Sequence, residues 1–257
     1  MLIDSPRLTS RDREAWARAE AIDAVNAQRA RLRAKAKAAR ETITTFAADG
    51  PCYLGVSWGK DSTVIAHLAV EIARVGGPRI PIAWVRREPI DNPDCHLVRD
   101  AFAARFPDAD LHEIRVDCEC DPTRPEQWWT AGRPGRAVSD QPKQVGFALA
   151  AARFGRRYIS GVRAAESGIR ELRMAKHGIV SANTCAPIGR WSTAEVFAYL
   201  HLHDLPIHPA YAMTLGGLLD RDRLRVGSIG GPHGRGHGRL EWERRYYPEI
   251  VAITVRP

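Results

Sequence analysis

The chain of 257 residues contains no apolar run long enough to span a bilayer, and its start lacks the apolar stretch of a secretory signal. Its five cysteines are an odd number, which argues against a disulfide framework in a chain without an export signal. These absences exclude a membrane-spanning protein and a disulfide-stapled secreted scaffold from the expected classes. We therefore expect a soluble cytoplasmic protein with free thiols and no membrane partner.

Acidic residues are fewer than basic ones: 30 Asp and Glu oppose 38 Lys and Arg, which leaves a net charge of +8. Most of the positive charge is arginine, whose planar guanidinium matches phosphate oxygens, so the balance suits a phosphate-bearing ligand. An arginine-rich proteome would produce the same balance, and charge alone leaves both interpretations open. The length allows one domain with a full core, or a core domain with a smaller appendage.

Helix and strand patterns alternate along most of the chain. Residues 11–46 contain no glycine or proline and are rich in Ala, Arg and Glu, which predicts one long or two short helices. Apolar runs then predict strands at 52–56, 79–85, 111–116 and 157–162. Helices are predicted between them, at 63–75, 94–106 and 145–154, with a loop at 117–136. This order predicts a parallel sheet covered on both faces, with ligands at the carboxyl ends of its strands.

The segment SWGKDS, residues 57–62, follows the first predicted strand and suggests a phosphate site. It is not a Walker A loop, because three residues instead of four separate Gly55 from Gly59, and Asp61 directly follows Lys60. A strand, a tight turn and a helix remain, and the first amides of that helix form an anion site together with the helix dipole. The competing interpretation is an ordinary strand-to-helix turn with an exposed lysine and an Asp or Ser cap.

Three segments of the chain match motifs of one superfamily. SWGKDS matches SGGKDS, with Trp58 in place of the first glycine of the pair. SGVRAAESGIR at 160–170 matches G-x-R-x-x-E-S-x-x-R, and APIGRWSTAEVFAYLHLHDLPIHPAY at 186–211 matches P-I-x-x-W-[ST]-x-x-[DE]-V-x-x-Y-L followed by [IL]-P-x-x-P-x-Y. In this order and over about residues 50–212, the chain resembles the PP-loop ATP pyrophosphatases, in their phosphoadenosine-phosphosulfate reductase branch.

The resemblance implies a HUP-like α/β fold of the adenine nucleotide alpha hydrolase type, a parallel twisted sheet with helices on both faces. We expect an N-terminal helical extension at 1–46, a PP-loop nucleotide-binding domain at 47–212, and a C-terminal tail at 213–257. The tail contains GGPHGRGHGR at 230–239, which we interpret as a mobile basic loop that closes on nucleotide or nucleic acid.

By analogy with this superfamily, the loop holds the β- and γ-phosphates of ATP while cleavage at the α-phosphate releases pyrophosphate. ATP and Mg²⁺ are the expected cofactors. Lys60 would neutralise the pyrophosphate, Asp61 would order the loop or hold magnesium, and Arg163 completes the predicted catalytic residues outside the cysteines. The predicted cofactor contacts are Ser57, Trp58, Gly59, Lys60, Asp61, Ser62, Arg86, Arg87, Gly161, Arg163 and Arg170.

For three of these predicted contacts, Trp58, Arg86 and Arg87, the sequence leaves more than one role open. Trp58 would narrow the pocket or stack on a ligand, and packing is the alternative. Arg86 and Arg87 leave a predicted strand on opposite faces. One of them would turn toward the α-phosphate or the acceptor, and the other would face solvent.

The second and third motifs have structural alternatives as well. Gly161 ends a strand and would let a ligand approach the backbone. Arg163 and Arg170 would reach phosphates or the substrate, and Glu166 would pin one of them, although a surface salt-bridge network is the plainer interpretation. Residues 192–200 are predicted to be a core helix that starts with a capping box.

The sequence argues against reduction by the routes known in the reductase branch. No cysteine follows Cys185, so the E-C-G-[IL]-H motif is missing, and the paired Cys-Cys and C-x-x-C of the iron–sulfur type do not occur. We therefore expect an ATP pyrophosphatase that adenylylates an acceptor for sulfur insertion. Members of this branch act in bacterial DNA phosphorothioation, so DNA is the expected acceptor. A cysteine desulfurase or another sulfur donor is the expected protein partner.

Three cysteines are candidate sulfur carriers and are included among the predicted catalytic residues. Cys118 and Cys120 lie in VDCECDP just past a predicted strand, and Cys185 precedes the third motif. Arginine and the anion site would lower the pKa of such a thiol and make it a nucleophile or a persulfide carrier. Inert thiols are the alternative, and the C-x-C pair alone falls short of the four ligands of a usual metal site.

Two further functions stay open. One is an enzyme of small-molecule sulfur metabolism, such as a sulfonucleotide reductase or a sulfate adenylyltransferase-like enzyme. The other is a catalytically inactive nucleotide-binding subunit. The basic stretch NAQRARLRAKAKAARET in the N-terminal helices would contact DNA phosphates or a partner, or would form a solvated face.

Overall fold

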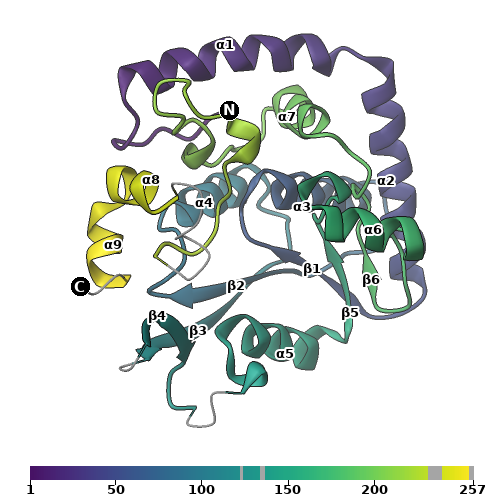
Figure 1. Cartoon of the computed structure of the whole chain (residues 1–257). Helices are drawn as coiled ribbons and strands as arrows, with labels where there is room; N and C mark the ends of the chain where they lie inside the picture. The colour runs from purple at the N-terminus through teal and green to yellow at the C-terminus, as the bar shows by residue number, and fades with distance from the viewer. Residues whose placement is uncertain (122–123, 134–136, 231–238, 255–257) are drawn as a thin grey trace.

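The computed structural model describes residues 1–121, 124–133, 137–230 and 239–254 (Figure 1). The strands are β1 (Cys52–Val56), β2 (Ile82–Glu88), β3 (Leu111–Asp121), β4 (Arg124–Thr130), β5 (Arg157–Ser160) and β6 (Thr184–Cys185). The α-helices are α1 (Ser10–Ala27), α2 (Ala30–Ala48), α3 (Lys60–Arg74), α4 (Cys95–Arg105), α5 (Pro142–Phe154), α6 (Gly168–His177), α7 (Thr193–Leu202), α8 (Arg239–Tyr246) and α9 (Pro248–Thr254). The 3-10 turns are η1 (Val138–Asp140), η2 (Ala164–Glu166), η3 (Pro209–Tyr211) and η4 (Arg221–Arg223). No membrane-spanning helix is found among the described residues.

A six-stranded sheet in the order β4-β3-β2-β1-β5-β6 forms the centre of the fold. From β3 to β6 the neighbouring strands pair in parallel, and β4 pairs antiparallel with β3. Leu54 of β1 lies between Ile82 and Ile159, and all three side chains are buried. A strand buried on both faces must be apolar along its length, which explains the uninterrupted apolar run of β1. The predicted α/β fold with a mostly parallel sheet is confirmed.

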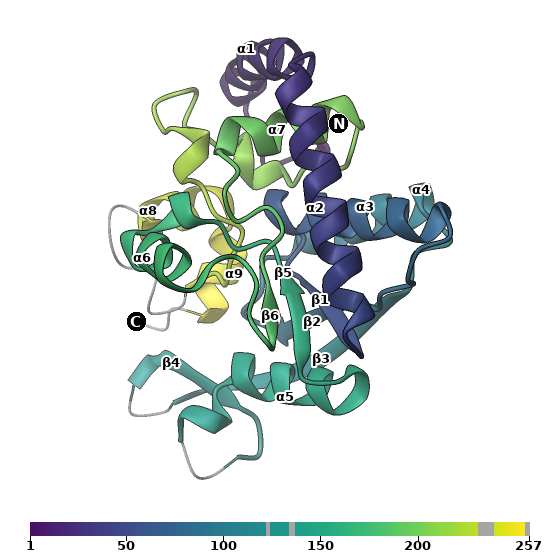
Figure 2. The ribbon, with the colours of Figure 1, turned by 90° about the vertical axis from the view of Figure 1, so that its right-hand side faces the viewer.

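Helices cover both faces of the sheet. α5 packs on β1, β2 and β3 from one side, and α3 packs on β1 from the other (Figure 1). α2 and α7 lie outside α3, and α1 packs on α7, so the N-terminal helices add a second layer on that side (Figure 2). Residues 11–46 thus form two helices, which break near Gln28 and Arg29.

The sheet has its topological switch at β1. The chain runs outward from β1 to β2 and β3 and later returns to β5 on the other side of β1. The segments that leave the carboxyl ends of β1 and β5 therefore diverge, and such a divergence creates the crevice in which open α/β sheets bind ligands. Residues 57–59 leave β1 and residues 161–167 leave β5, so the first two motifs meet at this crevice.

The predicted loop at 117–136 is wrong for much of its length. β3 continues through Asp121, and its Cys118 pairs with Thr130 of β4. The loop prediction rested on the prolines and glycines of this segment. The segment also contains residues of high strand propensity, Trp128, Trp129 and Thr130. Where these residues pair with β3, their strand propensity outweighs the turn preference of the prolines and glycines.

The predicted capping box at the start of α7 is present. The Ser192 hydroxyl accepts from the Glu195 N–H at 3.2 Å, and the Glu195 carboxylate accepts from the Ser192 N–H at 2.8 Å. Glu195 also pairs with Lys35 of α2 at 2.6 Å. One carboxylate thus starts α7 and anchors a helix of the N-terminal layer.

Asp12, in the first turn of α1, joins the N-terminal helices to the C-terminal segment. Its inaccessible carboxylate caps α1 with Thr9 and accepts from the Gly216 N–H at 2.8 Å and from the Tyr246 hydroxyl at 3.0 Å. Burial raises the pKa of Asp12, but hydrogen bonds from Gly216 and Thr9 outweigh it, so the pKa lies below its ordinary value. The contribution to stability is therefore present above the pKa of an unfolded aspartate and is lost as the pH falls through the folded pKa.

Replacing Asp12 by Ala leaves the half-buried Gly216 amide and the buried Tyr246 hydroxyl without their acceptor. We expect the free energy of unfolding at pH 7, measured with urea, to fall by about 3 kcal/mol. The difference from the wild type should shrink as the pH falls below the ordinary aspartate pKa of 3.8, because the pKa of Asp12 in the folded protein lies below that value. Asp4→Ala removes an exposed partner of Arg13 and serves as the control, with an unfolding midpoint close to that of the wild type. Equal losses in the two variants would contradict the role of Asp12.

Candidate functional site

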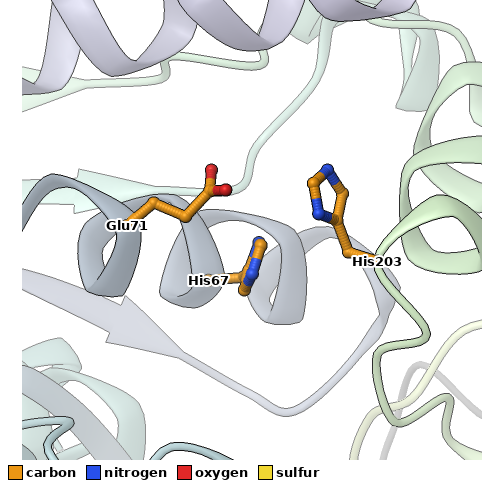
Figure 3. A group of neighbouring side chains, drawn as sticks. All are labelled: His67, Glu71 and His203. Carbon is orange, nitrogen blue, oxygen red and sulfur yellow. The ribbon is translucent and has the colours of Figure 1, made fainter. Parts of the chain in front are cut away.

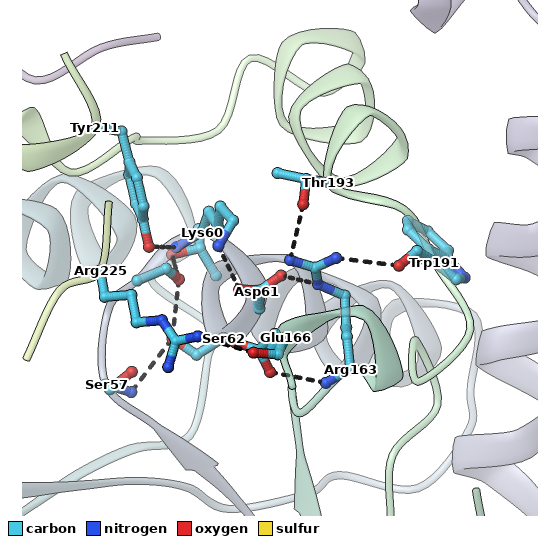
Figure 4. A network of polar contacts seen from close by, with 12 residues as sticks. Ser57, Lys60, Asp61, Ser62, Arg163, Glu166, Trp191, Thr193, Tyr211 and Arg225 are labelled. Carbon is cyan, nitrogen blue, oxygen red and sulfur yellow. Dashed lines mark hydrogen bonds and ion pairs between the residues drawn. The ribbon is translucent and has the colours of Figure 1, made fainter. Parts of the chain in front are cut away.

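The loop of residues 57–62 lies at the carboxyl end of β1, inside the crevice (Figure 4). Gly59 is the N-cap of α3. The N–H of Lys60 donates to the Tyr211 hydroxyl at 3.1 Å, whereas the N–H groups of the next two residues meet no acceptor among the described residues. Free amides at a helix N-terminus, together with the helix dipole, form an anion site.

The two serines of the loop have different tasks. The Ser62 hydroxyl accepts from the Ser57 N–H at 3.2 Å and donates to the Gly59 carbonyl at 2.9 Å, so it closes the turn. Ser57 itself is exposed at the rim of the site. A Cβ on Gly59 would lie 3.0 Å from the Tyr211 hydroxyl, so glycine keeps this turn compact. Ser57 is available to a ligand through its side chain, and Ser62 through its backbone N–H.

Trp58 stands where the SGGKDS pattern has a glycine, and its backbone shows why glycine suits the position. Its φ of 55° lies in the left-handed region, which costs a non-glycine residue about 1–3 kcal/mol. Burial offsets this cost, because the indole is 1% exposed and packs against Trp84 and Phe102. Of the predicted roles, packing is the one that the structure shows; stacking of Trp58 on a ligand is wrong, because the ring points into the core.

Asp61 forms ion pairs with two cations, Lys60 of the loop and Arg163 of the second motif. Its Oδ2 pairs with Lys60 Nζ at 2.9 Å, and its Oδ1 accepts from Arg163 Nε at 2.6 Å. Both carboxylate oxygens are engaged by protein groups. Asp61 therefore orders the loop, and a direct contact with magnesium would require one of these pairs to break.

Lys60 is not the exposed loop lysine that the sequence suggested. The residue is 4% exposed, and its ammonium lies 5.1 Å from the centre of the Tyr211 ring. Burial lowers the pKa of Lys60, but Tyr211 and Asp61 outweigh burial and hold the pKa above its ordinary value. The side chain is thus charged and held in one place beside the free amides of α3.

Arg163 positions Asp61 and does not reach into the crevice, so its predicted contact with phosphate is wrong. The side chain is 2% exposed, and its three nitrogens donate to Asp61, to the Trp191 carbonyl at 3.1 Å and to the Thr193 hydroxyl at 3.3 Å. It therefore ties the second motif to the third. A Cβ on Gly161 would lie 2.9 Å from the Asp61 backbone, so this glycine admits α3 and not, as predicted, a ligand.

Glu166 anchors the segment that follows β5. Its carboxylate accepts from the Arg163 N–H at 3.0 Å and pairs with Arg170, which confirms that it pins one of the two arginines. Arg225, which the sequence did not single out, donates to the Glu166 carbonyl at 2.9 Å, and its guanidinium lies on the loop side of Glu166 in Figure 4. Arg170 is partly exposed and Arg225 is exposed, so an anion in the crevice can reach both side chains.

Arg86 and Arg87 leave β2 on opposite faces, as predicted. Arg86 pairs with Glu113 at 2.9 Å and lies over the Trp84 ring, on the side away from α5. Arg87 lies on the α5 side, close enough to Lys143 to lower the pKa of that lysine. Arg87 is thus the inward member of the pair. Both arginines are held by carboxylates, Arg86 by Glu113 and Arg87 by Asp91, so neither extends freely.

Lys143, in the first turn of α5, was not predicted. Although the residue is exposed, desolvation by the atoms around its amine lowers its pKa, and Arg87 and Arg170 lower it further. These three cations come from three different elements and lie near enough to one another to affect the pKa of Lys143, although Arg87 also pairs with Asp91 and Arg170 with Glu166. Their mutual repulsion is relieved when an anion binds. A lysine in the first turn of a helix opposes the helix dipole, and this is the signal by which the sequence could have singled out Lys143.

Two of the candidate sulfur carriers, Cys118 and Cys185, do not have the lowered pKa that was predicted. Cys185 is inaccessible in β6 and Cys118 is half-buried in β3, and burial raises the pKa of both thiols to about 12. Arg87 lowers the pKa of Cys118 by too little to reverse this. Cys120, also half-buried in β3, lies with Cys118 several strands away from β6. The structure therefore does not bring the three cysteines together.

Cys95 touches the loop although the sequence left it unassigned. Its sulfur lies 3.5 Å from the Ser57 carbonyl and 3.8 Å from His208 Nε2. Burial raises the pKa of Cys95 and lowers that of His208 to about 3, so a neutral thiol faces a neutral imidazole. This pair packs beneath the turn. The glycine-rich loop predicted at 230–239 lies almost wholly outside the described residues.

Replacing Trp58 by Gly relieves the left-handed φ but removes an indole from the core. Loss of the ring costs about 3–5 kcal/mol and relief of the backbone returns about 1 kcal/mol, so we expect a net loss of about 2–4 kcal/mol in urea unfolding. Trp58→Ala is the matched control, because it empties the same space and keeps the strain. It should be less stable than Trp58→Gly. The opposite order would show that the left-handed backbone carries no cost.

Comparison with known proteins shows the family to which the chain belongs. The family model described as phosphoadenosine phosphosulfate reductase domain matches residues 51–233. A crystal structure of phosphoadenylyl-sulfate (PAPS) reductase from Candida auris, in a phosphate complex, is similar at 14% identity and a TM-score of 0.45, over 66% of this chain and 82% of that chain. No curated protein matches the chain. Because the family match spans well over half of the chain and includes the loop at 57–62, the chain belongs to the phosphoadenosine phosphosulfate reductase domain family of the PP-loop superfamily.

Proposed function

We propose that the chain is an ATP pyrophosphatase, which cleaves ATP between the α- and β-phosphates and transfers the adenylyl group to an acceptor for sulfur insertion. The observation that carries the proposal is the anion site at the start of α3. Free helix amides lie there beside Lys60, whose ammonium is held by Tyr211 and Asp61. Several fixed donors and one fixed positive charge suit a phosphate group that must be held firmly while a bond next to it breaks.

The pyrophosphate part of ATP would occupy the loop. Ser57, the amides of Asp61 and Ser62, and the ammonium of Lys60 would be its contacts. Negative charge builds on the leaving pyrophosphate as the bond to the α-phosphate breaks, and groups already in place stabilise that charge without reorganising. Burial of Lys60 is therefore an advantage for catalysis, because its position is settled before the nucleotide binds.

The α-phosphate and the acceptor would lie beside Arg87, Lys143 and Arg170. These cations come from β2, α5 and α6 and not from the loop that would hold the pyrophosphate. They would neutralise the α-phosphate during attack by the acceptor. The acceptor atom would form a bond to the α-phosphorus, and pyrophosphate would leave with the bonding electron pair.

Magnesium would accompany the phosphates of ATP. Asp61 fits poorly as its ligand, because Lys60 and Arg163 occupy both of its oxygens. Asp222 of η4 is the better candidate: burial and Asp220 raise its pKa, and Arg221, Lys60 and Arg163 lie near enough to lower it, which sets this exposed carboxylate in the neighbourhood of the site. It would hold magnesium directly or through water, and the ion would neutralise phosphate oxygens.

DNA is the acceptor that we propose, with a separate protein such as a cysteine desulfurase as the sulfur donor. The net charge of +8 and the cations at the sheet edge support a nucleic acid partner. Helix α2 contributes less to such a surface than its composition suggests, because Lys35 pairs with Glu195 and Arg40 pairs with Glu71. The raised pKa values of the Cys118 and Cys185 thiols support delivery of sulfur by another protein.

A sulfonucleotide enzyme is the second candidate, since Arg87, Lys143 and Arg170 would equally suit the sulfate or the additional phosphate of an activated sulfate. Two product assays on the purified chain separate the candidates. Pyrophosphate formed from ATP in the presence of DNA supports the adenylylating enzyme. Sulfite formed from an activated sulfate supports the second candidate. ATP binding without either product supports a catalytically inactive subunit.

Replacing Lys60 by Met removes the ammonium but keeps an unbranched side chain against Tyr211. We expect pyrophosphate release to fall by at least about 100-fold, or about 2.7 kcal/mol in the barrier, with circular dichroism unchanged. Lys37→Met alters an exposed lysine of α2 and is the control, with wild-type turnover expected. Unchanged turnover in Lys60→Met would sink the assignment of the loop as a phosphate site.

Arg87 and Arg86 form a second matched pair of variants. We expect Arg87→Ala to slow pyrophosphate release by at least about tenfold, or about 1.4 kcal/mol, with little change in ATP affinity. The reason is that charge at the α-phosphate changes only as the bond breaks. Arg86→Ala alters the opposite face of β2 and should leave turnover within about twofold of the wild type. Equal turnover in the two variants would refute the inward role of Arg87.

A further inference from the structure

His67, Glu71 and His203 form a cluster outside the anion site (Figure 3). His67 and Glu71 lie one turn apart on α3 and share a face of the helix, and His203 is the C-cap of α7. One ligand atom from each residue lies within 4.8 Å of the other two. His67 is about 10 Å along the helix from Lys60, so the cluster is separate from the loop. Sequence reasoning missed it because α3 and α7 are far apart along the chain.

A cavity of about 400 Å³ opens beside this cluster, between α2, α3 and α7, and is partly open to solvent. Glu71, His203 and Tyr199 line it, together with Arg33, Arg40 and apolar side chains of α2 and α7. An ion therefore has a route to the cluster. The cavity also leaves room for a water molecule or a small anion as a further ligand.

The groups around the cluster orient its members. The Tyr199 hydroxyl lies 2.9 Å from His67 Nδ1 and donates to Glu71 Oε2 at 3.2 Å. Arg40 donates to the same oxygen at 2.9 Å, and no donor to Glu71 Oε1 is present among the described residues. One carboxylate oxygen is thus held by outer partners while the other is left for a ligand, which is how ligating carboxylates are usually supported.

The ligand set favours a transition metal over magnesium or calcium. Two imidazoles and one carboxylate are a usual set for Zn²⁺, whereas magnesium and calcium take oxygen ligands. Burial lowers the pKa of His67 to about 3 and also lowers that of His203, so both rings are neutral and keep a lone pair. Arg40 and Arg105 lie near His67. Their charge disfavours a weakly held cation, so only a metal with strong affinity for imidazole would bind.

We propose that His67, Glu71 and His203 bind a Zn²⁺-type divalent transition metal, with the fourth coordination position open to the cavity. Ligand atoms around a tetrahedral zinc ion lie about 3.4 Å apart. The side chains must therefore close by at most about 1.4 Å, and His203, partly exposed at the end of α7, has the freedom to move. Binding would clamp α7 to α3. The proposal does not rest on the proposed function of the loop.

The test is a metal titration of the full chain after treatment with a chelator. Zn²⁺ affinity is measured by competition with a chromophoric chelator, and Co²⁺ is added separately as a spectroscopic probe. We expect one tight Zn²⁺ per chain, an intense visible Co²⁺ spectrum of tetrahedral type, and a higher unfolding temperature with Zn²⁺. His203→Ala and Glu71→Gln should each weaken Zn²⁺ binding by at least about 100-fold and abolish the thermal shift.

His201→Ala is the matched control, because His201 lies on α7 two residues before His203 and outside the cluster. It should bind Zn²⁺ like the wild type. The double variant Cys118→Ser/Cys120→Ser should also retain the site, which separates it from binding by thiols. Wild-type affinity in both His203→Ala and Glu71→Gln, or loss of tight Zn²⁺ in the cysteine variant, would overturn the proposal.

Discussion

The ion pairs of Asp61 with Lys60 and Arg163 are the interaction on which the site depends. Both cations are almost fully buried, and a buried charge is costly unless a partner and hydrogen bonds compensate it. Asp61 provides the partner for both, and Arg163 passes the connection on to the Trp191 carbonyl and the Thr193 hydroxyl. The three sequence motifs are therefore held together by one carboxylate, and the crevice between β1 and β5 obtains its shape from that connection.

Packing of the surrounding side chains holds the turn between β1 and α3 in one conformation, including the strained backbone of Trp58. Trp58 holds a left-handed backbone because its indole is fixed in the core, while Gly59 and Gly161 allow Tyr211 and Asp61 to approach closely. Strain of this kind persists only where the surrounding packing determines it. The free amides of α3 are consequently aimed before any ligand arrives, which is the condition for electrostatic stabilisation without reorganisation.

Helix α3 carries two candidate sites along its length. Its N-terminus offers amides and a lysine to an anion, whereas His67 and Glu71, about two to three turns further on, lie near α7 with groups that suit a cation. The two sites differ in what a helix provides: the terminus contributes backbone donors and the dipole, and the middle contributes side chains at a spacing of four residues. Packing of α2 and α7 on the outer side of α3 brings the third ligand and the cavity to the second site.

The sequence by itself determined the alternating strands and helices, the capping box of α7 and the anion site of residues 57–62, because each depends on neighbours within a few residues. Only the tertiary structure decided which side chains face that site. In the folded protein Lys60 and Trp58 are buried, and the Arg163 guanidinium pairs with Asp61. Burial also raises the pKa of the Cys118 and Cys185 thiols. Lys143, Arg225 and His203 lie in the candidate clusters because folding brings together elements that are far apart in the chain. Spacing along a chain predicts local geometry, whereas desolvation and ion pairing depend on neighbours that only folding brings together.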